Sequence, residues 1–444
     1  MKKILIKNAT IVNEGSQLEG DVLVEGEYIS SIGNALSDPT AEVIDAQGKY
    51  LIPGVIDDQV HFREPGLTHK GTIATESRAG LAGGVTSYIE QPNTIPQTVT
   101  IAALEDKMAI ANASSFSNYS FNFGGTNDNL EELKRLDKKA CAGVKLFLGS
   151  STGNMLVDDQ QVLESIFKST EMIISAHCED EQIIRTNMEL YKERYGEDIP
   201  MSSHPLIRSA EACYLSSSNA IALAKKTKAR LHIFHVSTAK ETTLFRNDIP
   251  LKEKRITAEV CTHHLWFCNE DYSEKGSFIK WNPAVKTAQD REALWDALND
   301  DRIDVLATDH APHSLEEKNN VYTSAPSGGP LVQHSLVALL EKQKEGKISL
   351  TRLIEKMCHN PAILFNIEKR GFIREGYYAD LVLVDPSKSW KVTKENIAYK
   401  CGWSPFEGIE FSSAVTHCFV NGHLGYENGR FSAVRNAKRL TFER

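Results

Sequence analysis

Several side chains that can bind a metal ion stand at or near the ends of short apolar runs. They are His61, Lys145, His177, His235 and Asp309, with Gln59 two residues before His61. A single histidine at such a position is usually a hydrogen-bonded structural group. Two or three imidazoles and a carboxylate that converge on one point are ligand chemistry for a metal ion. Imidazole with carboxylate suits zinc, with manganese or iron as alternatives.

These residues can converge only if the apolar runs form neighbouring strands. Between residues 54 and about 345, apolar runs alternate with amphipathic stretches. The predicted strands are 54–61, 84–90, 118–123, 142–148, 172–177, 231–236, 256–262 and 303–309, and the helical stretches include 70–82, 100–112, 158–168, 205–226 and 287–298. The alternation predicts parallel βα units, and eight strands are the number that closes a (β/α)8 TIM-type barrel. An open doubly wound sheet is the alternative, but no GxGxxG follows the first strand.

The direction of the side chains follows from the strand prediction. Alternate residues share one face of a strand, so Gln59 accompanies His61, and Asp309 is predicted to point the same way as Ala307. In a barrel this face points inward at the carboxyl-terminal rim, where barrel enzymes keep their active sites. The metal-binding candidates should therefore meet at that rim.

Both ends of the chain carry short strands and turns. Residues 3–53 contain apolar runs separated by glycines, and residues after 360 return to strand-like sequence with a predicted hairpin turn at Asn421-Gly422. The simplest arrangement is one β-sandwich-like subdomain formed by 1–53 plus 360–444. It flanks a barrel domain over 54–359.

Composition narrows the class of protein. The chain has 444 residues, of which 41% are hydrophobic and 25% charged, so a disordered or fibrous chain is excluded. A net charge of −9 argues against nucleic acid or an anionic membrane as the main partner. No apolar run is long enough to span a membrane. Eight scattered cysteines without a CxxC pair suggest reduced thiols and a cytoplasmic protein.

Eight short motifs carry a family resemblance that covers nearly the whole chain. They are PGVID (53–57), HFREPG (61–66), QPNT (91–94), GVK (143–145), AHCE (176–179), HVS (235–237), NP (282–283) and ATDHAPH (307–313). With them the chain resembles the amidohydrolase superfamily and, within it, the dihydroorotases of class I type. The HFREPG and ATDHAPH strings together are the most specific part of the resemblance.

The resemblance implies a zinc centre of one or two ions at the matched positions. His61 and Asp309 would bind one metal, and His177 and His235 the other. Lys145 would carry a CO2-derived carbamate that bridges them, because an ammonium cannot bind a metal but a neutral, desolvated amine can react with CO2. The alternative for Lys145 is a charge that extends from the strand end to solvent.

One position departs from the family pattern. The family has His-x-His at the end of the first strand, whereas this chain has Gln59-Val60-His61. An amide oxygen is a poorer zinc ligand than imidazole, so Gln59 would be a weak ligand. Three interpretations follow: a binuclear site with one weak metal, a mononuclear site with His177, His235 and modified Lys145, or a non-catalytic relative.

The resemblance also implies a substrate-binding set. The residues are Arg63, Asn93, Asn282 and His313, which would hold a carboxylate, and Ser327 and Gly328, whose backbone would hold a ring amide. A guanidinium grips a carboxylate with two parallel hydrogen bonds; the alternative for Arg63 is a salt bridge with Glu64. The family's Pro-Pro-Leu-Arg is Pro-Ala-Val-Lys at 283–286 here, and its Glu-Thr pair is Gln-His at 333–334.

The implied reaction is reversible hydrolysis of (S)-dihydroorotate to N-carbamoyl-L-aspartate, used in the reverse direction in pyrimidine biosynthesis. Asp309 would be both ligand and catalytic acid/base. The alternative activities are those of other cyclic amidases, hydantoinase or allantoinase. Those enzymes generally lack an arginine at the position of Arg63. The expected partners are a small-molecule substrate, a second copy in a homodimer, and aspartate transcarbamoylase. Residues 313–328, long and polar, are the predicted mobile loop.

Overall fold

Eight parallel strands form the central barrel. The computed structural model describes residues 2–149 and 155–444, and within them the barrel strands are β6 (Val55–Val60), β7 (Val85–Glu90), β8 (Asn118–Gly124), β9 (Gly143–Phe147), β10 (Ile173–His177), β11 (Arg230–Ile233), β12 (Ile256–Cys261) and β13 (Val305–Ala307). Each pairs in parallel with the next in sequence. The two edge strands meet where Val60 and His310 form a parallel bridge. The predicted barrel is confirmed.

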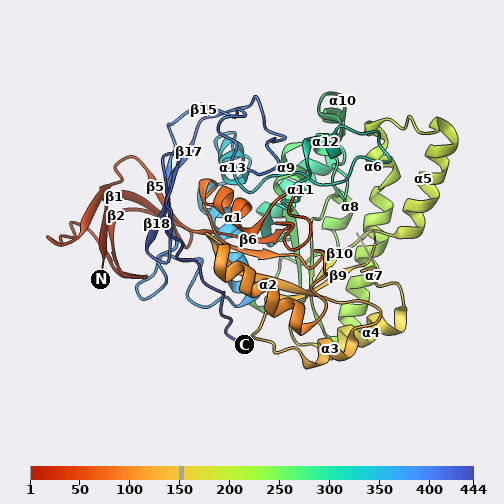
Figure 1. Cartoon of the computed structure of the whole chain (residues 1–444), viewed down its shortest axis with the longest axis horizontal. Helices are drawn as coiled ribbons and strands as arrows, with labels where there is room; N and C mark the ends of the chain where they lie inside the picture. Colours follow the sequence, from red (N-terminus) through yellow and green to blue (C-terminus); the bar gives the residue numbers. More distant parts are fainter. Residues whose placement is uncertain (1, 150–154) are drawn as a thin grey trace.

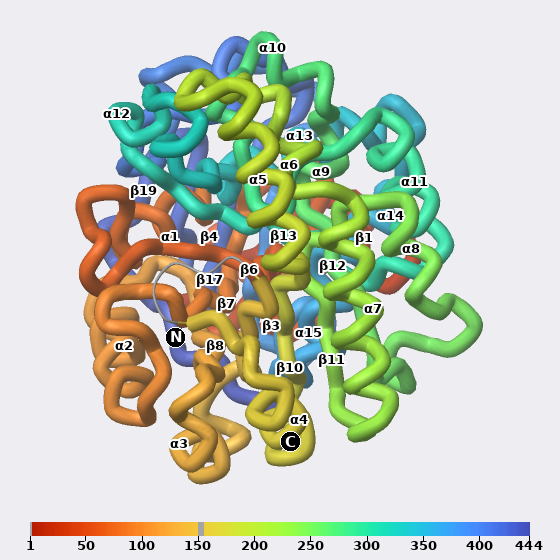
Figure 2. Tube along the Cα trace, turned by 90° about the vertical axis from the view of Figure 1, so that its right-hand side faces the viewer, coloured from red at the N-terminus to blue at the C-terminus, as the bar shows by residue number. Residues whose placement is uncertain are grey.

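Helices surround the barrel (Figure 2). They are α1 (Ile73–Ala82), α2 (Ile101–Ser114), α3 (Leu130–Arg135), α4 (Gln160–Ser169), α5 (Glu181–Tyr195), α6 (His204–Ile207), α7 (Ala210–Thr227), α8 (Ala239–Thr242), α9 (Thr262–Trp266), α10 (Tyr272–Lys275), α11 (Ala288–Asn299), α12 (Leu315–Lys318), α13 (Ser335–Lys344), α14 (Leu350–Ile354) and α15 (Asn360–Phe365). The side chains of Thr72, Asp159, Ser209 and Thr287 accept hydrogen bonds from backbone N–H groups at the starts of α1, α4, α7 and α11. These caps explain why the helices begin near the predicted positions.

A second sheet combines both ends of the chain (Figure 1). Its described strands are β1 (Lys3–Asn13), β2 (Ser16–Glu25), β3 (Tyr28–Gly33), β4 (Glu42–Asp45), β5 (Tyr50–Pro53), β14 (Leu381–Asp385), β17 (Ala414–Val420), β18 (His423–Glu427) and β19 (Arg430–Phe431). The sheet joins the two ends where β5 pairs with β14. Asn421 and Gly422 both have positive φ in the tight turn between β17 and β18, as a two-residue hairpin requires. A separate pair consists of β15 (Trp390–Lys391) and β16 (Glu410–Phe411).

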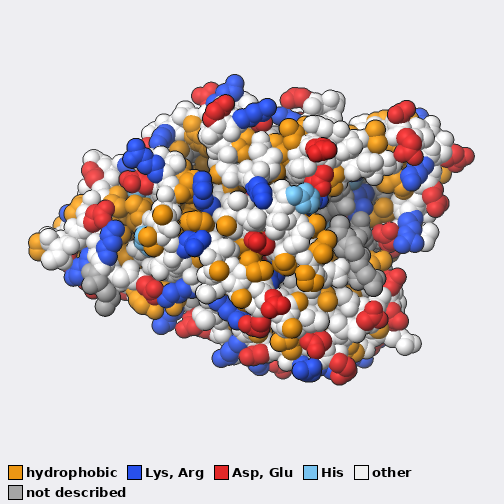
Figure 3. All heavy atoms as spheres, viewed as in Figure 1, with side chains coloured by type: hydrophobic (Ala, Val, Ile, Leu, Met, Phe, Trp, Pro, Cys, Tyr) orange, Lys and Arg blue, Asp and Glu red, His pale blue; other side chains and the backbone are white. Residues whose placement is uncertain are grey.

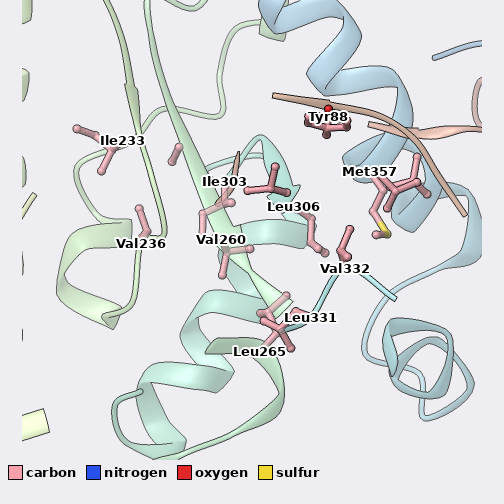
Figure 4. Packing of buried hydrophobic residues seen from close by; sticks show 14 of the residues in the cluster. Tyr88, Ile233, Val236, Val260, Leu265, Ile303, Leu306, Leu331, Val332 and Met357 are labelled. Atoms are coloured by element: carbon pink, nitrogen blue, oxygen red, sulfur yellow. The ribbon is translucent and has the colours of Figure 1, made fainter. Parts of the chain in front are cut away.

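Strand alternation separates the barrel interior from its outer core. In β12, Val260 faces the helices, where it packs with Leu306 and Leu265 of α9 (Figure 4). Its neighbours Glu259 and Cys261 contact the barrel interior instead. The apolar side chains thus hold the helices to the barrel, and the opposite faces remain for polar groups.

The outer surface carries charges of both signs. On the face shown in Figure 3, acidic and basic side chains alternate without an extended region of one sign. No helix in the described part of the chain has the length and apolar content needed to cross a membrane.

Candidate metal centre

A pocket of about 230 Å³ opens at the carboxyl ends of the barrel strands. It gathers every residue proposed for the site: Gln59, His61, Arg63, Asn93, Lys145, His177, His235, Asn282, Asp309, His313, Ser327 and Gly328. Phe147, Trp281, Ala311 and Pro326 complete the wall. The structure therefore brings the predicted residues together, whereas their chemical roles remain predictions.

A larger cavity, of about 730 Å³, lies at the other end of the barrel. Its described lining includes Arg230 at the start of β11 and Leu364 of α15, but no imidazole. Size alone favours this cavity as a binding site. The smaller pocket is the better candidate because, of the described linings of these two cavities, only its lining contains imidazoles, which are common zinc ligands.

The side chain of Lys145, on β9, is buried next to two aromatic rings. Its side chain is 1% exposed, and its Nζ has no hydrogen-bond partner among the described residues. The ring centroids of Phe234 and Phe147 lie 4.1 and 4.9 Å from Nζ. Burial lowers the pKa of this amine to about 7. Much of Lys145 is therefore neutral near pH 7, as carbamate formation requires, and it does not extend to solvent.

His177 and His235 lie side by side in the pocket wall. The distance from Nδ1 of His177 to Nε2 of His235 is 3.0 Å. Nε2 of His177 lies 2.9 Å from Glu179, whose carboxylate is in turn paired with Arg208. Burial lowers the pKa of both imidazoles. Both rings are thus neutral, which is the state that binds a metal, and Glu179 orients the ring of His177.

His61 and Asp309 form the second half of the site. Nε2 of His61 lies 3.2 Å from Oδ1 of Asp309. Nδ1 of His61 is 2.8 Å from the amide oxygen of Asn93, so Nδ1 donates and Nε2 keeps its lone pair toward the pocket. The amide oxygen of Gln59 accepts from the thiol of Cys261 at 3.7 Å. The amide of Gln59 thus occupies the position at which the family has a second imidazole ligand.

The backbone at the rim corrects the predicted strand ends. His235 and Asp309 were expected to end their strands, but β11 ends at Ile233 and β13 at Ala307. His235, Asp309 and Arg63 instead have positive φ values of 40°, 49° and 73°. A non-glycine residue in this region costs about 1–3 kcal/mol and persists only where its surroundings enforce it. This turn, not strand alternation, directs His235 and Asp309 into the pocket.

Arg63 lies buried in the pocket wall. Its Nε donates to the carbonyl of Pro312, and its Nη2 lies 3.0 Å from Nε2 of His313. No described carboxylate forms an ion pair with it, and Glu64 instead accepts a hydrogen bond from the backbone of Ile73. Burial lowers the pKa of Arg63 to about 10, so it stays charged at neutral pH. The guanidinium is therefore available to an anion in the pocket.

Buried lysines fix the loop that carries Ser327 and Gly328. Lys318 donates to the carbonyls of Pro326 and Gly328, and Lys280 donates to those of Tyr322 and Ala325. Nε2 of His313 lies 3.0 Å from the carbonyl oxygen of Ser327. The described loop thus closes one wall of the pocket, and its predicted mobility remains a prediction.

Some contributors were absent from the predicted site. Glu179 stood within a quoted motif, but its partner Arg208 is 29 residues away and no spacing signals the pair. Trp281 lines the pocket and stacks on His263 at 4.3 Å between ring centroids. His204 and His310 serve structural contacts, with Tyr322 and with Glu76.

The donor set fits a zinc-type centre. Nitrogens of two neutral imidazoles converge, and a third imidazole sits beside a carboxylate. The buried amine of Lys145, which has no hydrogen-bond partner among the described residues, lines the same pocket. Beyond the pocket, two further compact groups of potential ligands occur in the described chain: Asp58, His232 and Glu259, and Cys261, His263 and His264. In the second group, burial raises the pKa of the Cys261 thiol well above its usual range.

Comparison with known proteins gives one family and two activities. Residues 50–425 match the Amidohydrolase family. A dihydroorotase of Halobacterium salinarum is 35% identical over 391 residues, covering 87% of this chain and 89% of that protein. A dihydroorotase of Bacillus subtilis is 32% identical, covering 96% and 99%. Among solved structures, the L-hydantoinase (dihydropyrimidinase) from Arthrobacter aurescens has a TM-score of 0.94 at 28% identity, covering 99% of this chain and all of that one.

Proposed function

The chain belongs to the amidohydrolase family and is a hydrolase that acts on cyclic amides, and from this premise we propose that it is a dihydroorotase. It interconverts (S)-dihydroorotate and N-carbamoyl-L-aspartate. The observation that carries this choice is Arg63, a buried guanidinium in the pocket wall without an ion pair among the described residues. Dihydroorotate brings a carboxylate to that charge; hydantoin and dihydrouracil do not.

The substrate is held from its carboxylate side. Arg63 donates to the carboxylate, and Asn93, Asn282 and His313 complete its binding, since all four side chains line the same pocket. The backbone at Ser327 and Gly328 binds the ring amide. Burial lowers the pKa of His313 well below its usual value, so it adds no second charge.

His61, His177, His235, Asp309 and the carbamate of Lys145 would hold the metal, with Gln59 as a weak ligand. One or two zinc ions, when bound, lower the pKa of water toward neutrality and polarise the amide carbonyl. Asp309 accepts the proton of the attacking water and delivers it to the ring nitrogen that leaves. In the ring-closing direction it moves the proton the other way.

Two alternatives have specific support. The L-hydantoinase structure superimposes with a TM-score of 0.94, which supports a substrate without a carboxylate. Gln59 supports a non-catalytic relative, because one imidazole ligand is missing. Against both, the residues proposed to bind the carboxylate line the same pocket as those proposed to bind the metal.

The deciding experiment measures turnover of L-dihydroorotate by the purified protein with added zinc and bicarbonate, alongside dihydrouracil and hydantoin. We expect turnover of dihydroorotate only. Arg63→Gln should reduce kcat/KM for dihydroorotate roughly 100-fold, because the variant loses the charge-assisted hydrogen bonds to the carboxylate. The loss should appear as a higher KM. Faster turnover of the substrates without a carboxylate would establish a hydantoinase. No turnover by folded, zinc-loaded protein would overturn the dihydroorotase proposal in favour of another cyclic amide or a non-catalytic relative.

This activity implies a cellular context. The enzyme would serve de novo pyrimidine (UMP) biosynthesis in the cytoplasm, in the ring-closing direction. It would act as a homodimer and associate with aspartate transcarbamoylase, whose product is its substrate. Sedimentation of the purified protein, alone and with that enzyme, tests both associations.

A further inference from the structure

A second polar cluster lies in the barrel interior, below the pocket. It consists of Asp58 on β6, His232 on β11 and Glu259 on β12, and all three side chains have zero exposure. One ligand atom of each lies within 4.8 Å of the other two. Interiors of such barrels are usually filled by branched apolar side chains, so three buried polar groups need an explanation.

Four polar atoms of the cluster have no hydrogen-bond partner among the described residues. Nε2 of His232 lies 3.4 Å from Oδ2 of Asp58 and 3.7 Å from Oε2 of Glu259. These atoms and Oδ1 of Asp58 have no hydrogen-bond partner among the described residues. Neighbouring Asp57 differs, because its carboxylate accepts from both the hydroxyl and the backbone N–H of Thr308. Leaving several buried polar atoms unpaired is costly.

The orientations of His232 and Glu259 are set from outside the cluster. The hydroxyl of Thr257 donates to the carbonyl of Leu231, so it accepts from Nδ1 of His232 at 2.8 Å. Although burial opposes it, the carboxylates of Asp58 and Glu259 raise the pKa of His232 to about 9, so the cluster favours a positive charge at Nε2. Oε1 of Glu259 accepts from the backbone N–H of His235, which leaves Oε2 directed at His232. Oxygens of two carboxylates thus face Nε2 of His232, and the positive charge between them is either a proton on Nε2 or a metal ion.

The distances separate a metal ion from protons. Protons shared within the cluster would draw the atoms to hydrogen-bond separations of roughly 2.7–3.2 Å. Ligands about 2.1 Å from a tetrahedral zinc ion lie roughly 3.4 Å apart. The observed 3.4 and 3.7 Å match the second case. Two carboxylates and a neutral imidazole also balance the charge of one divalent ion.

We propose that Asp58, His232 and Glu259 bind a divalent cation of the zinc class in the barrel interior, separate from the metal centre of the pocket. The ion has a structural role. It ties three strands together, and through Glu259 it fixes the backbone at His235. Because the site has no exposure, the ion enters while the chain folds.

Metal counting tests the site on protein produced in zinc-supplemented medium and freed of loose metal. The variant Asp58→Asn/Glu259→Gln should contain about one zinc ion per chain less than the parent. The variant His177→Asn/His235→Asn should lose the pocket metal but keep the interior ion. Asp57→Asn, a buried neighbour with a satisfied carboxylate, is the matched control and should keep the parent's zinc content. Equal zinc in parent and Asp58→Asn/Glu259→Gln overturns the proposal.

Anomalous X-ray diffraction at the zinc edge decides the matter if the double variant does not fold. A peak among Asp58, His232 and Glu259 of the parent supports the proposal. Zinc in the pocket with no peak in the interior overturns it and leaves a hydrogen-bonded cluster. Neither result depends on turnover, so this test is independent of the proposed activity.

Discussion

The two ends of the barrel differ in what their strands carry: titratable side chains around a pocket at one end and a packed apolar cluster at the other. At the carboxyl end, the strands pass into a pocket of titratable side chains, with His235 and Asp309 in positive-φ conformations. At the amino end, Ile56, Ile173 and Val305, near the starts of their strands, pack with Phe365 in an apolar cluster. The residues of the proposed site lie at the carboxyl end, and the apolar packing at the amino end stabilises the strands that bear them. Activity and stability should therefore respond to substitutions at different ends.

The largest effect is expected from Asp309→Asn. The amide cannot take the proton of the attacking water, so kcat should fall roughly 10³-fold or more while the fold remains. Turnover of dihydroorotate and the melting temperature are the measurements.

Asp304→Asn, just before β13 at the amino end, is the matched control for Asp309→Asn. Its carboxylate pairs with Lys254 at 2.6 Å in the interior. Breaking such a buried pair costs about 3–5 kcal/mol, so this variant should lose stability and keep its kcat. Parent-like turnover in Asp309→Asn would show that Asp309 is not a catalytic residue. The two ends of the barrel would then not differ in their effect on activity.

Phe365→Ala should have the opposite effect to Asp309→Asn, a loss of stability without a loss of kcat. Its ring is fully buried in the cluster at the amino end, and its removal should destabilise the protein by about 3–5 kcal/mol with kcat unchanged in the folded fraction. Thermal unfolding checks the first expectation and turnover the second. Phe372→Ala, at the half-buried edge of the same cluster, should cost clearly less. A kcat that fell with Phe365→Ala would show that the two ends are coupled.

The extent of sequence-based prediction differs between the same two ends. The eight strands were predictable because runs such as 173–177 are short, apolar and separated by helical patterns. The pocket residues followed from those strands and from the motifs. The conformations of His235 and Asp309 were not predictable, since the contacts that enforce positive φ come from distant segments. The partnership of Glu179 with Arg208 also depends on tertiary contacts.

The interior cluster was invisible for a related reason. Asp58, His232 and Glu259 lie on three strands and share no spacing in the sequence. Only the register of β11 against β12, which places His232 beside Thr257, brings them to one level. Register is a property of the closed barrel and not of any one segment.

Lys145 offers a smaller, pH-dependent test of the carboxyl end. With a pKa of about 7, its amine is mostly protonated below pH 7 and mostly neutral above it. At a fixed concentration of dissolved CO2, the rate of carbamate formation should rise about fivefold from pH 6 to 7 and level off above about pH 8. Nuclear magnetic resonance with ¹³C-labelled CO2 measures this rate directly, and Lys145→Met should lose the resonance of this one carbamate. A rate that keeps rising through pH 10 is the behaviour of an ordinary lysine and contradicts the desolvated environment.

The smallest effect is expected at Gln59, and it tests whether the rim lacks a ligand. Its amide oxygen accepts a hydrogen bond from the Cys261 thiol. The proposed metal ligands in that half of the pocket are therefore only His61 and Asp309, beside Lys145. Gln59→His should therefore raise zinc content by up to about one ion per chain, since imidazole binds zinc better than an amide. Gln59→Leu, similar in size but without a donor atom, should not raise it. Because the interior cluster is unchanged in both variants, any difference in zinc reports the rim alone. Equal zinc in parent and Gln59→His would mean that the carboxyl end already holds all the metal its geometry admits.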